Sequence, residues 1–171
     1  MTPTQPSFSA QLKRSSGMLV LLSALTIFAF YFTERYRIAF NGAASECLRA
    51  SVFLIDSWDK SVATGQLVAF KMTKDIPIAG KGATWVKKVV AMPGQTVQVG
   101  HESVSVGSVR YPLQTSYVLS KLGMKFEDVK PEWQLSQNQI FLLGETLTSF
   151  DSRFWGPIES EEIVGKAYAI F

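Results

Sequence analysis

The chain of 171 residues has one cysteine, Cys47, and one histidine, His101. An intrachain disulfide is therefore excluded, and so is a zinc site built from four cysteine and histidine ligands. A Ser–His–Asp triad would need His101, which lies among alternating polar residues between two glycines. We expect His101 to be a solvated hairpin residue. The sequence predicts no metal site and no cofactor, and any nucleophilic chemistry would need a base other than histidine.

Charged residues are also scarce, at 18% of the chain, and they are unevenly distributed. Residues 1–37 carry four positive groups and one negative group, whereas the other 134 residues carry 13 of each sign. The pI of about 9.0 therefore reflects the N-terminal segment. Because nucleic-acid binding needs a basic surface on the folded part, a nucleic acid is not an expected partner.

A hydrophobic run occupies residues 17–32, where 13 of 16 residues are apolar. With its mild polar flanks it approaches the length of a helix that crosses a bilayer, at about 1.5 Å per residue. Lys13 and Arg14 precede the run, and aromatic residues crowd its far end, as in a membrane anchor. The alternative is a cleaved signal peptide, but its small-residue site at 42–44 lies well beyond the run. We therefore predict an uncleaved anchor.

These features predict three parts of the chain. Residues 1–14 form a cytoplasmic stub, residues 15–37 form the transmembrane anchor with its flank, and residues 38–171 form an extracytoplasmic domain. The outer part contains short runs rich in β-branched and aromatic residues, separated by Gly, Pro, Asn or Asp, as is typical of strands. The predicted strands are 52–55, 66–70, 84–91, 96–99, 103–106, 140–143 and 163–171.

Two segments qualify this strand pattern. Pro93–Gly94 predicts a type II turn between two strands, with glycine supplying the positive φ. Residues 117–133 contain several charged residues and predict a short helix or an inserted loop. We expect a mostly-β domain tethered to a membrane by one N-terminal helix.

Two adjacent lysines lie in the predicted strand 84–91. Side-chain alternation places Lys87 on the same face as Trp85 and Val89, and it places Lys88 on the opposite face. One lysine must therefore project among apolar neighbours. Desolvation disfavours the ammonium form, and a neutral amine is a competent general base. The alternative is an edge strand whose lysines protect against aggregation.

A second polar segment follows the apolar strand 140–143. Ser149, Asp151 and Arg153 alternate, so their side chains would point the same way along an extended backbone. Asp151 could pair with Arg153, and the Ser149 hydroxyl could orient a nearby amine. By itself, the pattern is equally typical of an ordinary polar turn.

Taken together, the two segments resemble the type I signal peptidase (leader peptidase) superfamily. The resemblance rests on the lysine strand, the Pro-Gly turn, a Gly-acidic loop, the run Ser149–Gly156 and a final Ile-Val-Gly-Lys-Ala. It implies a membrane-anchored serine–lysine peptidase with a β-barrel or β-sandwich catalytic domain. That domain would lie in the periplasm, outside the inner membrane, and would act on a secreted or membrane precursor.

One branch of the superfamily is more similar than the others. Val52–Ile55 followed by Gly65–Phe70 resembles the TraF-like peptidases of conjugative plasmids, which mature and in some systems cyclise a pilin. This similarity implies a pilin precursor as substrate and conjugation-apparatus proteins as further partners.

The resemblance also assigns roles to individual residues. Lys87 matches the general base, Ser149 matches the hydroxyl that orients it, and Asp151 with Arg153 matches the supporting ion pair. The nucleophile differs, because Cys47-Leu48-Arg49 stands where the branch typically has Ser-Leu-Pro or Ser-Met-Pro.

Several alternatives remain open at this position. Ser45 is the alternative nucleophile, and Cys47 could also be a small buried residue, as free cysteines commonly are. In addition, Gln66, Gln95 and Glu145 stand where the family usually has aspartate. The chain is thus a divergent member of the group that it resembles.

A thiol at this position suits acyl transfer. Cys47 would attack a backbone carbonyl, Lys87 would take and return the proton, and a backbone N–H would stabilise the oxyanion. The resulting thioester favours attack by an amine more than an oxygen ester does, which suits transpeptidation as well as hydrolysis.

Two other functions compete with this interpretation. A catalytically inactive structural subunit of a conjugation or secretion apparatus is favoured by the altered residues Cys47 and Arg49. A self-cleaving repressor-like domain also uses a Ser–Lys pair, but the anchor and the absence of a basic DNA-binding module argue against it.

Overall fold

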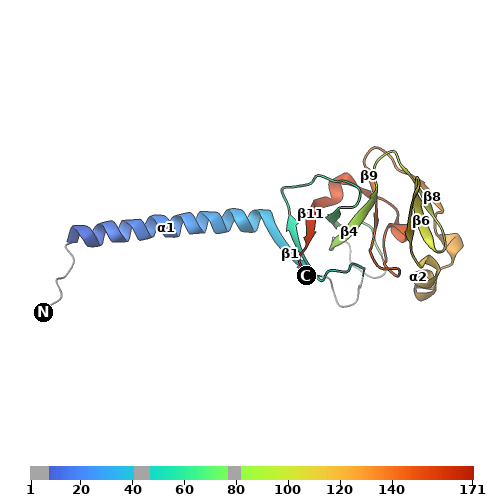
Figure 1. Cartoon of the computed structure of the whole chain (residues 1–171), viewed down its shortest axis with the longest axis horizontal. Coiled ribbons are helices and arrows are strands. Elements are labelled where there is room, and N and C mark those ends of the chain that lie inside the picture. The colour runs from blue at the N-terminus through green and yellow to red at the C-terminus, as the bar shows by residue number, and fades with distance from the viewer. Residues whose placement is uncertain (1–7, 41–46, 77–81) are drawn as a thin grey trace. The chain divides into compact units, whose positions relative to one another are not determined.

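The computed structural model describes residues 8–40, 47–76 and 82–171. The chain divides into two compact units, Met1–Tyr36 and Arg37–Phe171 (Figure 1). The first unit contains helix α1 (Phe8–Arg35). Within α1, Gly17–Arg35 has a mean hydropathy of 1.7 and is long and apolar enough to cross a membrane.

Polar side chains inside this apolar stretch are satisfied within the helix. The hydroxyls of Ser23, Thr26 and Thr33 each donate to a backbone carbonyl one turn earlier. Helix α1 begins at Phe8, so part of the stub predicted for residues 1–14 is helical. It ends at Arg35, two residues before the end of the predicted flank, and strand β1 begins at Tyr36.

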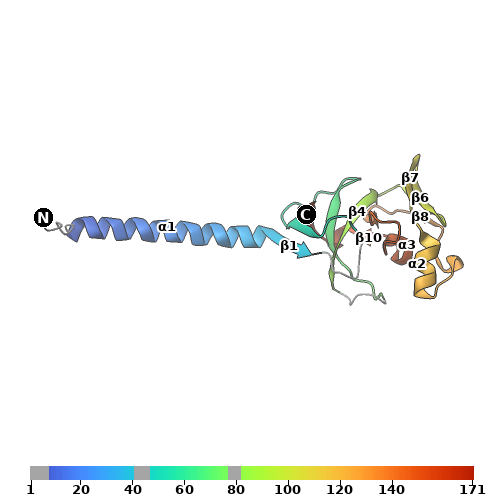
Figure 2. The same cartoon turned by 60° about the horizontal axis from the view of Figure 1, so that its bottom comes forward.

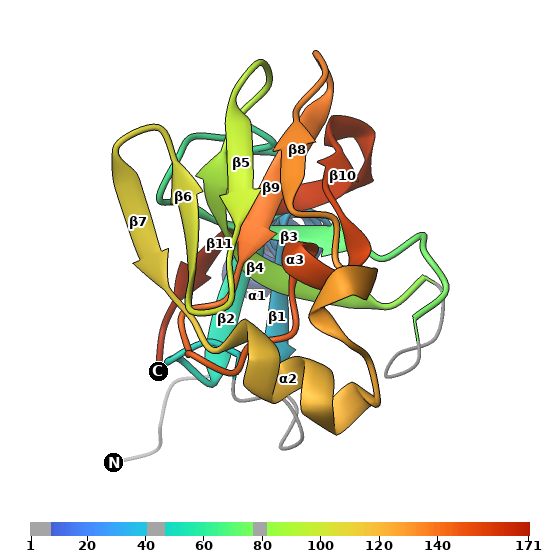
Figure 3. The same cartoon turned by 90° about the vertical axis from the view of Figure 1, so that its right-hand side faces the viewer.

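The second unit contains two antiparallel sheets. The larger has seven strands in the order β1 (Tyr36–Phe40), β2 (Val52–Asp56), β11 (Ile163–Ala169), β3 (Leu67–Lys71), β4 (Thr84–Ala91), β9 (Gln139–Leu143) and β10 (Ile158–Glu159). The smaller has four strands in the order β7 (Val109–Pro112), β6 (Ser103–Val106), β5 (Thr96–Val99) and β8 (Glu132–Gln134). Figures 2 and 3 show the strands of the smaller sheet side by side as a separate layer.

Short helices connect these strands. They are α2 (Thr115–Leu122), the 3-10 turn η1 (Phe126–Asp128), α3 (Ser152–Trp155) and the 3-10 turn η2 (Ser160–Glu162). Helix α2 carries Val118 into one hydrophobic core and Leu119 into the other, because neighbouring residues of a helix face different directions. The segment predicted as an inserted loop or short helix thus forms part of α2, η1 and the start of β8.

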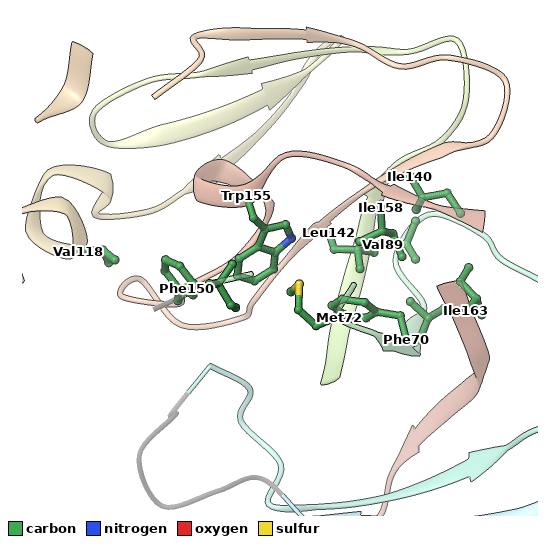
Figure 4. Packing of buried hydrophobic residues seen from close by; sticks show 12 residues of the cluster. Phe70, Met72, Val89, Val118, Ile140, Leu142, Phe150, Trp155, Ile158 and Ile163 are labelled. Carbon is green, nitrogen blue, oxygen red and sulfur yellow. The ribbon is translucent and has the colours of Figure 1, made fainter. Parts of the chain in front are cut away.

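The end of β4, from Val89 to Ala91, and most of β9 are buried on both faces because a core lies on each side of them. Val89 and Leu142 pack in one core with Phe150 and Trp155 (Figure 4). The second core lies toward the smaller sheet and contains Val90, Ala91, Phe141 and Leu143 with the valines of β5 and β6. A β-bulge between Val89 and Ala91 shifts the register of β4 against β9.

The mostly-β prediction is confirmed. The predicted strands 84–91, 96–99 and 103–106 match β4, β5 and β6, and the other four differ from the observed strands only at their ends. In the part of the chain that the structure describes, the larger sheet stays open at β1 and β10 and does not close into a barrel. Gly94 has a φ of 82°, as the predicted turn requires.

Candidate active site

Strand β4 places its two lysines in contrasting environments. Lys87 is 2% exposed and pairs with Val68 of β3 in the strand register, whereas the Lys88 side chain is 37% exposed. Because β4 lies between β3 and β9, the alternative of an edge strand protected by lysines is wrong. The lysine held among apolar neighbours is therefore Lys87.

The Lys87 amine lies near a hydroxyl and an aromatic ring. Its Nζ lies 3.3 Å from the Ser149 Oγ, to which it donates. It also lies 5.5 Å from the centroid of the Trp85 ring. Trp85 in turn makes edge contact with Trp155, with ring centroids 5.3 Å apart. Aromatic packing on one side and a hydroxyl on the other fix the position of the amine.

Cys47 is also buried and lies beside this amine. Its thiol is in contact with Lys87 and Ser149, and the Phe150 backbone N–H donates to it. Burial raises the pKa of the Cys47 thiol, but the Lys87 charge and hydrogen bonds from Ser149, Lys87 and Phe150 outweigh burial and lower the pKa. A thiol in an apolar pocket is inert, whereas one beside a cation has increased thiolate character. Cys47 therefore has the surroundings of a nucleophile.

The backbone around Cys47 is held by the segment that follows β9. The Glu145 backbone N–H donates to the Cys47 carbonyl oxygen at 2.7 Å, and the Thr146 N–H reaches the same oxygen at 3.4 Å. A Cβ atom on Gly144 would collide with the Ser149 side chain and with the Cys47 carbonyl oxygen. A glycine at the end of β9 thus allows Ser149 and Cys47 to approach each other.

A buried ion pair lies next to this segment. Asp151 is 0% and Arg153 is 1% exposed. The Arg153 Nε donates to the Asp151 Oδ1 at 2.7 Å, and its Nη2 donates to Oδ2 at 2.9 Å. This bidentate geometry is the stronger form of a guanidinium–carboxylate pair.

The ion pair extends to the backbone of the site. Asp151 Oδ2 accepts from the Gly144 N–H at 3.1 Å, and Arg153 donates to the Ser149 carbonyl. Arg153 also donates to the Thr115 hydroxyl at 3.2 Å. Asp151 and Arg153 therefore fix the two backbone positions that bracket the loop 144–149.

The local conformation differs from the extended one that the sequence alternation suggested. Asp151 is the N-cap of α3 and accepts from the Arg153 backbone N–H, so Arg153 lies in the first helical turn. The helix turns the Arg153 side chain back onto Asp151. The pair forms, but through a helix cap rather than along a strand.

The structure brings together Cys47, Lys87, Ser149, Asp151 and Arg153, and it places His101 elsewhere. His101 is exposed, its ring stacks on Phe126 with centroids 3.7 Å apart, and its Nδ1 lies 3.0 Å from the Ser116 Oγ. Ser45, the alternative nucleophile, lies outside the described residues.

Sequence reasoning missed three contributors to the site. A signal for Gly144 was present, since a glycine directly follows an apolar strand. No sequence signal indicated the Phe150 backbone N–H or the Thr115 hydroxyl, because their roles depend on contacts between distant segments. No pattern within residues 115–122 indicates that α2 supplies a partner for Arg153.

A comparison with protein families gives a match over most of the chain. The model of the family described as signal peptidase, peptidase S26, matches residues 12–171. The chain belongs to the peptidase S26 family. Because the match runs through the second unit, the site described above lies within the S26 homology region.

Individual members of the S26 family show more distant similarity. The probable signal peptidase I-1 of Synechocystis sp. is 29% identical over 106 residues, which are 60% of this chain and 51% of that protein. The signal peptidase I of Leptolyngbya laminosa is 30% identical over 88 residues, which are 51% of this chain and 40% of that protein. The S26 chain thus spans about half the length, or less, of these relatives.

A solved S26 structure can also be superposed on the chain. The crystal structure of a signal peptidase I from Enterococcus faecalis V583 matches with a TM-score of 0.41 and 20% sequence identity. The match covers 63% of this chain and 97% of that one.

Proposed function

We propose that this protein is a membrane-anchored peptidase in which Cys47 is the nucleophile and Lys87 is the general base. The observation that carries the proposal is the contact of the Cys47 thiol with the buried amine of Lys87 and with Ser149. Membership of the peptidase S26 family supports the same class of reaction. Helix α1 is the candidate anchor, and we propose that residues 38–171 face the periplasm.

The contact between Cys47 and Lys87 suggests a resting ion pair of thiolate and ammonium, since the Lys87 charge lowers the pKa of the thiol. In the first step, the thiolate attacks the carbonyl carbon of the scissile bond and forms a tetrahedral oxyanion. The C–N bond then breaks, and the Lys87 ammonium gives its proton to the leaving amine. The products of this half-reaction are a thioester on Cys47, a free amine and a neutral Lys87.

In the second half-reaction, water or an amine attacks the thioester. Neutral Lys87 takes the proton of the attacking group, and the thiolate leaves as the carbonyl reforms. This restores the ion pair of Cys47 and Lys87 with all protons accounted for. Since Lys87 must release and regain a proton, an arginine at this position would not serve.

Ser149, Asp151 and Arg153 have positioning roles in this proposal. The Ser149 hydroxyl orients the Lys87 amine at 3.3 Å and also touches the Cys47 thiol. Asp151 and Arg153 hold the backbone of Gly144 and Ser149, so they act on the reaction through the hydroxyl.

We propose a pilin precursor as the substrate, with cyclisation as a second outcome of the same chemistry. The support is the similarity of Val52–Ile55 and its following segment to the TraF-like branch. A thioester intermediate adds to it, because it favours transfer to an amine. A free N-terminal amine of the pilin would then replace water in the second half-reaction and close the chain head to tail.

Intact-mass analysis of a co-expressed pilin precursor tests this proposal. Wild-type protein should shorten the precursor, and a product lighter by one further water would show cyclisation. Cys47→Ala and Lys87→Met should leave the precursor unprocessed, while Ser51→Ala, an exposed hydroxyl near Cys47 in sequence, is the matched control. If Ser45→Ala abolished processing and Cys47→Ala still processed the precursor, Ser45 would be the nucleophile instead of Cys47.

The same experiment addresses the alternative of a structural subunit. That alternative is favoured by the replacement of the family's usual serine and proline by Cys47 and Arg49. Identical precursor masses with and without the wild-type protein would support it and would contradict a peptidase.

A further inference from the structure

A cavity of about 550 Å³ lies on the Lys88 side of β4, opposite the face that carries Lys87. It is lined by residues from four separate segments of the second unit. These include Arg49, Lys88, Val90, Leu113, Glu145 and Thr146. The cavity borders the second hydrophobic core through Val90 and Leu113, and charged side chains form another part of its wall.

The cavity adjoins the proposed nucleophile through the backbone. Glu145 and Thr146 line it, and their N–H groups donate to the Cys47 carbonyl oxygen at 2.7 and 3.4 Å. Arg49, which also lines it, follows Cys47 by two residues. A group bound in this cavity would therefore lie close to the backbone of Cys47.

The charges around the cavity do not cancel. Arg49 and Lys88 are positive and Glu145 is negative, which leaves one positive charge in excess. Glu145 accepts from the Lys88 Nζ at 3.5 Å and from the Arg49 backbone N–H at 3.3 Å. Among the ion pairs of the described residues, none involves the Arg49 guanidinium.

The wall of the cavity also includes Thr146 and two apolar side chains. The Thr146 Oγ1 is buried and has no hydrogen-bond partner from the described residues, although buried polar atoms are normally paired. Val90 and Leu113 supply an apolar wall beside it. The cavity thus combines an exposed guanidinium with a surface suited to methylene groups.

We propose that this cavity binds an acidic side chain, aspartate or glutamate, of the peptide substrate close to the scissile bond. That the bound group belongs to a substrate rests on the proposed peptidase function. That the cavity prefers an anion rests on the charges of its lining residues. The carboxylate would pair with the Arg49 guanidinium, which can donate two parallel hydrogen bonds. Lys88 would complete the charged side of the site, and Val90 and Leu113 would contact the methylene groups.

Two alkylating reagents of the same size test the charge preference beside Cys47. Iodoacetate is an anion and iodoacetamide is neutral, and the chain has one cysteine, so intact mass reports alkylation of Cys47 alone. The ratio of their rates at one pH cancels any change in the thiolate fraction. Arg49→Gln and Lys88→Gln should each lower the iodoacetate-to-iodoacetamide ratio about two- to fivefold, as expected for one charge several ångströms away.

A variant that removes a negative charge should change the ratio in the opposite direction. Glu145→Gln should raise the ratio by a similar factor, because it removes the one negative charge of the cavity. Lys60→Gln, which removes an exposed lysine outside the cavity, is the control and should keep the wild-type ratio. The proposal is overturned if Arg49→Gln and Lys88→Gln keep the wild-type ratio, or if Lys60→Gln changes it equally.

Synthetic peptides that span the mapped cleavage site test the link to substrate. Peptides with glutamate at one flanking position should be cleaved faster than the matched glutamine peptides, and Arg49→Gln should remove this preference. Equal cleavage of every Glu and Gln pair by wild-type protein would overturn the acidic preference while the peptidase function stands. If no peptide is cleaved, the peptidase function fails, and the alkylation ratio alone decides whether the cavity attracts an anion.

Discussion

Each face of β4 carries a lysine, and the two lysines have different surroundings. On one face, Lys87 is 2% exposed and contacts a thiol and a hydroxyl. On the other face, the Lys88 side chain is 37% exposed and pairs with a carboxylate on Glu145 at 3.5 Å. Adjacent residues of one strand thus place one lysine amine in a buried, polar contact and the other in a partly solvated ion pair.

The comparison shows that the surroundings, rather than the residue type, determine the role. Burial removes water from Lys87, so its charge acts strongly on the neighbouring Cys47 thiol. Lys88 is partly solvated, so its ion pair is screened and contributes little to stability. The following predictions test this difference, beginning with the largest expected effect.

Replacement of Lys87 should have the largest effect. Lys87→Met retains much of the side-chain volume but removes the proton acceptor, and we expect kcat/KM for precursor cleavage to fall by about 10²–10⁴-fold. Lys87→Arg should be equally inactive, since the guanidinium keeps its proton. Lys60→Met, at an exposed lysine, is the control. Cleavage at the wild-type rate by either Lys87 variant would rule out a catalytic role for this amine.

Loss of the buried ion pair should destabilise the domain strongly. Arg153→Met leaves the Asp151 carboxylate buried and uncompensated, and we expect the free energy of unfolding to fall by about 3–5 kcal/mol. Urea unfolding followed by tryptophan fluorescence measures it. Lys166→Met, which breaks the more exposed pair with Asp59, should change the midpoint far less. Similar shifts in the two variants would show that burial does not distinguish these pairs.

A side chain on Gly144 should disturb both stability and the site. Gly144→Ala places a Cβ against Ser149 and the Cys47 carbonyl oxygen, and we expect a loss of about 1–3 kcal/mol from overpacking. Gly17→Ala in α1 is the matched control, because a Cβ there has no heavy atom within 4 Å. A fully stable Gly144→Ala variant with wild-type cleavage would show that the close approach is not required.

Removal of Lys88 should have the smallest effect on stability. Lys88→Met breaks a partly solvated ion pair, and we expect the free energy of unfolding to change by no more than about 1 kcal/mol. Urea unfolding of this variant beside Lys87→Met compares the two faces directly. If Lys88→Met lowered the free energy of unfolding as much as Arg153→Met does, solvent would not screen the Lys88–Glu145 ion pair as we expect.

Much of the fold followed from local patterns. The β-branched run Thr84–Ala91 predicted β4 with its observed bounds, and its alternation put Lys87 and Lys88 on opposite faces. Strands β1, β7, β8 and β10 were not predicted. Strand β10 has two residues and β8 has three, so neither contains enough alternation to be recognised.

The site was less predictable because its geometry depends on tertiary contacts. The alternation of Ser149, Asp151 and Arg153 suggested an extended chain, but Asp151 caps α3 and the backbone turns there. With this cap in place, Arg153 donates to Thr115 on α2, a contact between segments far apart in sequence. The approach of Cys47 to Ser149 likewise depends on Gly144, whose role is visible only in three dimensions.

The pH dependence of Cys47 alkylation tests the interaction between Cys47 and Lys87 most directly. The Lys87 charge and hydrogen bonds lower the pKa of the thiol despite its burial, so the rate with iodoacetamide should rise at a pH below the ordinary thiol range. In Lys87→Met the charge is gone, so burial should raise the pKa of the Cys47 thiol and shift the increase in alkylation rate to higher pH. Lys87→Arg keeps the positive charge, so its increase should shift less. Identical profiles for wild type and Lys87→Met would contradict a thiol–amine pair.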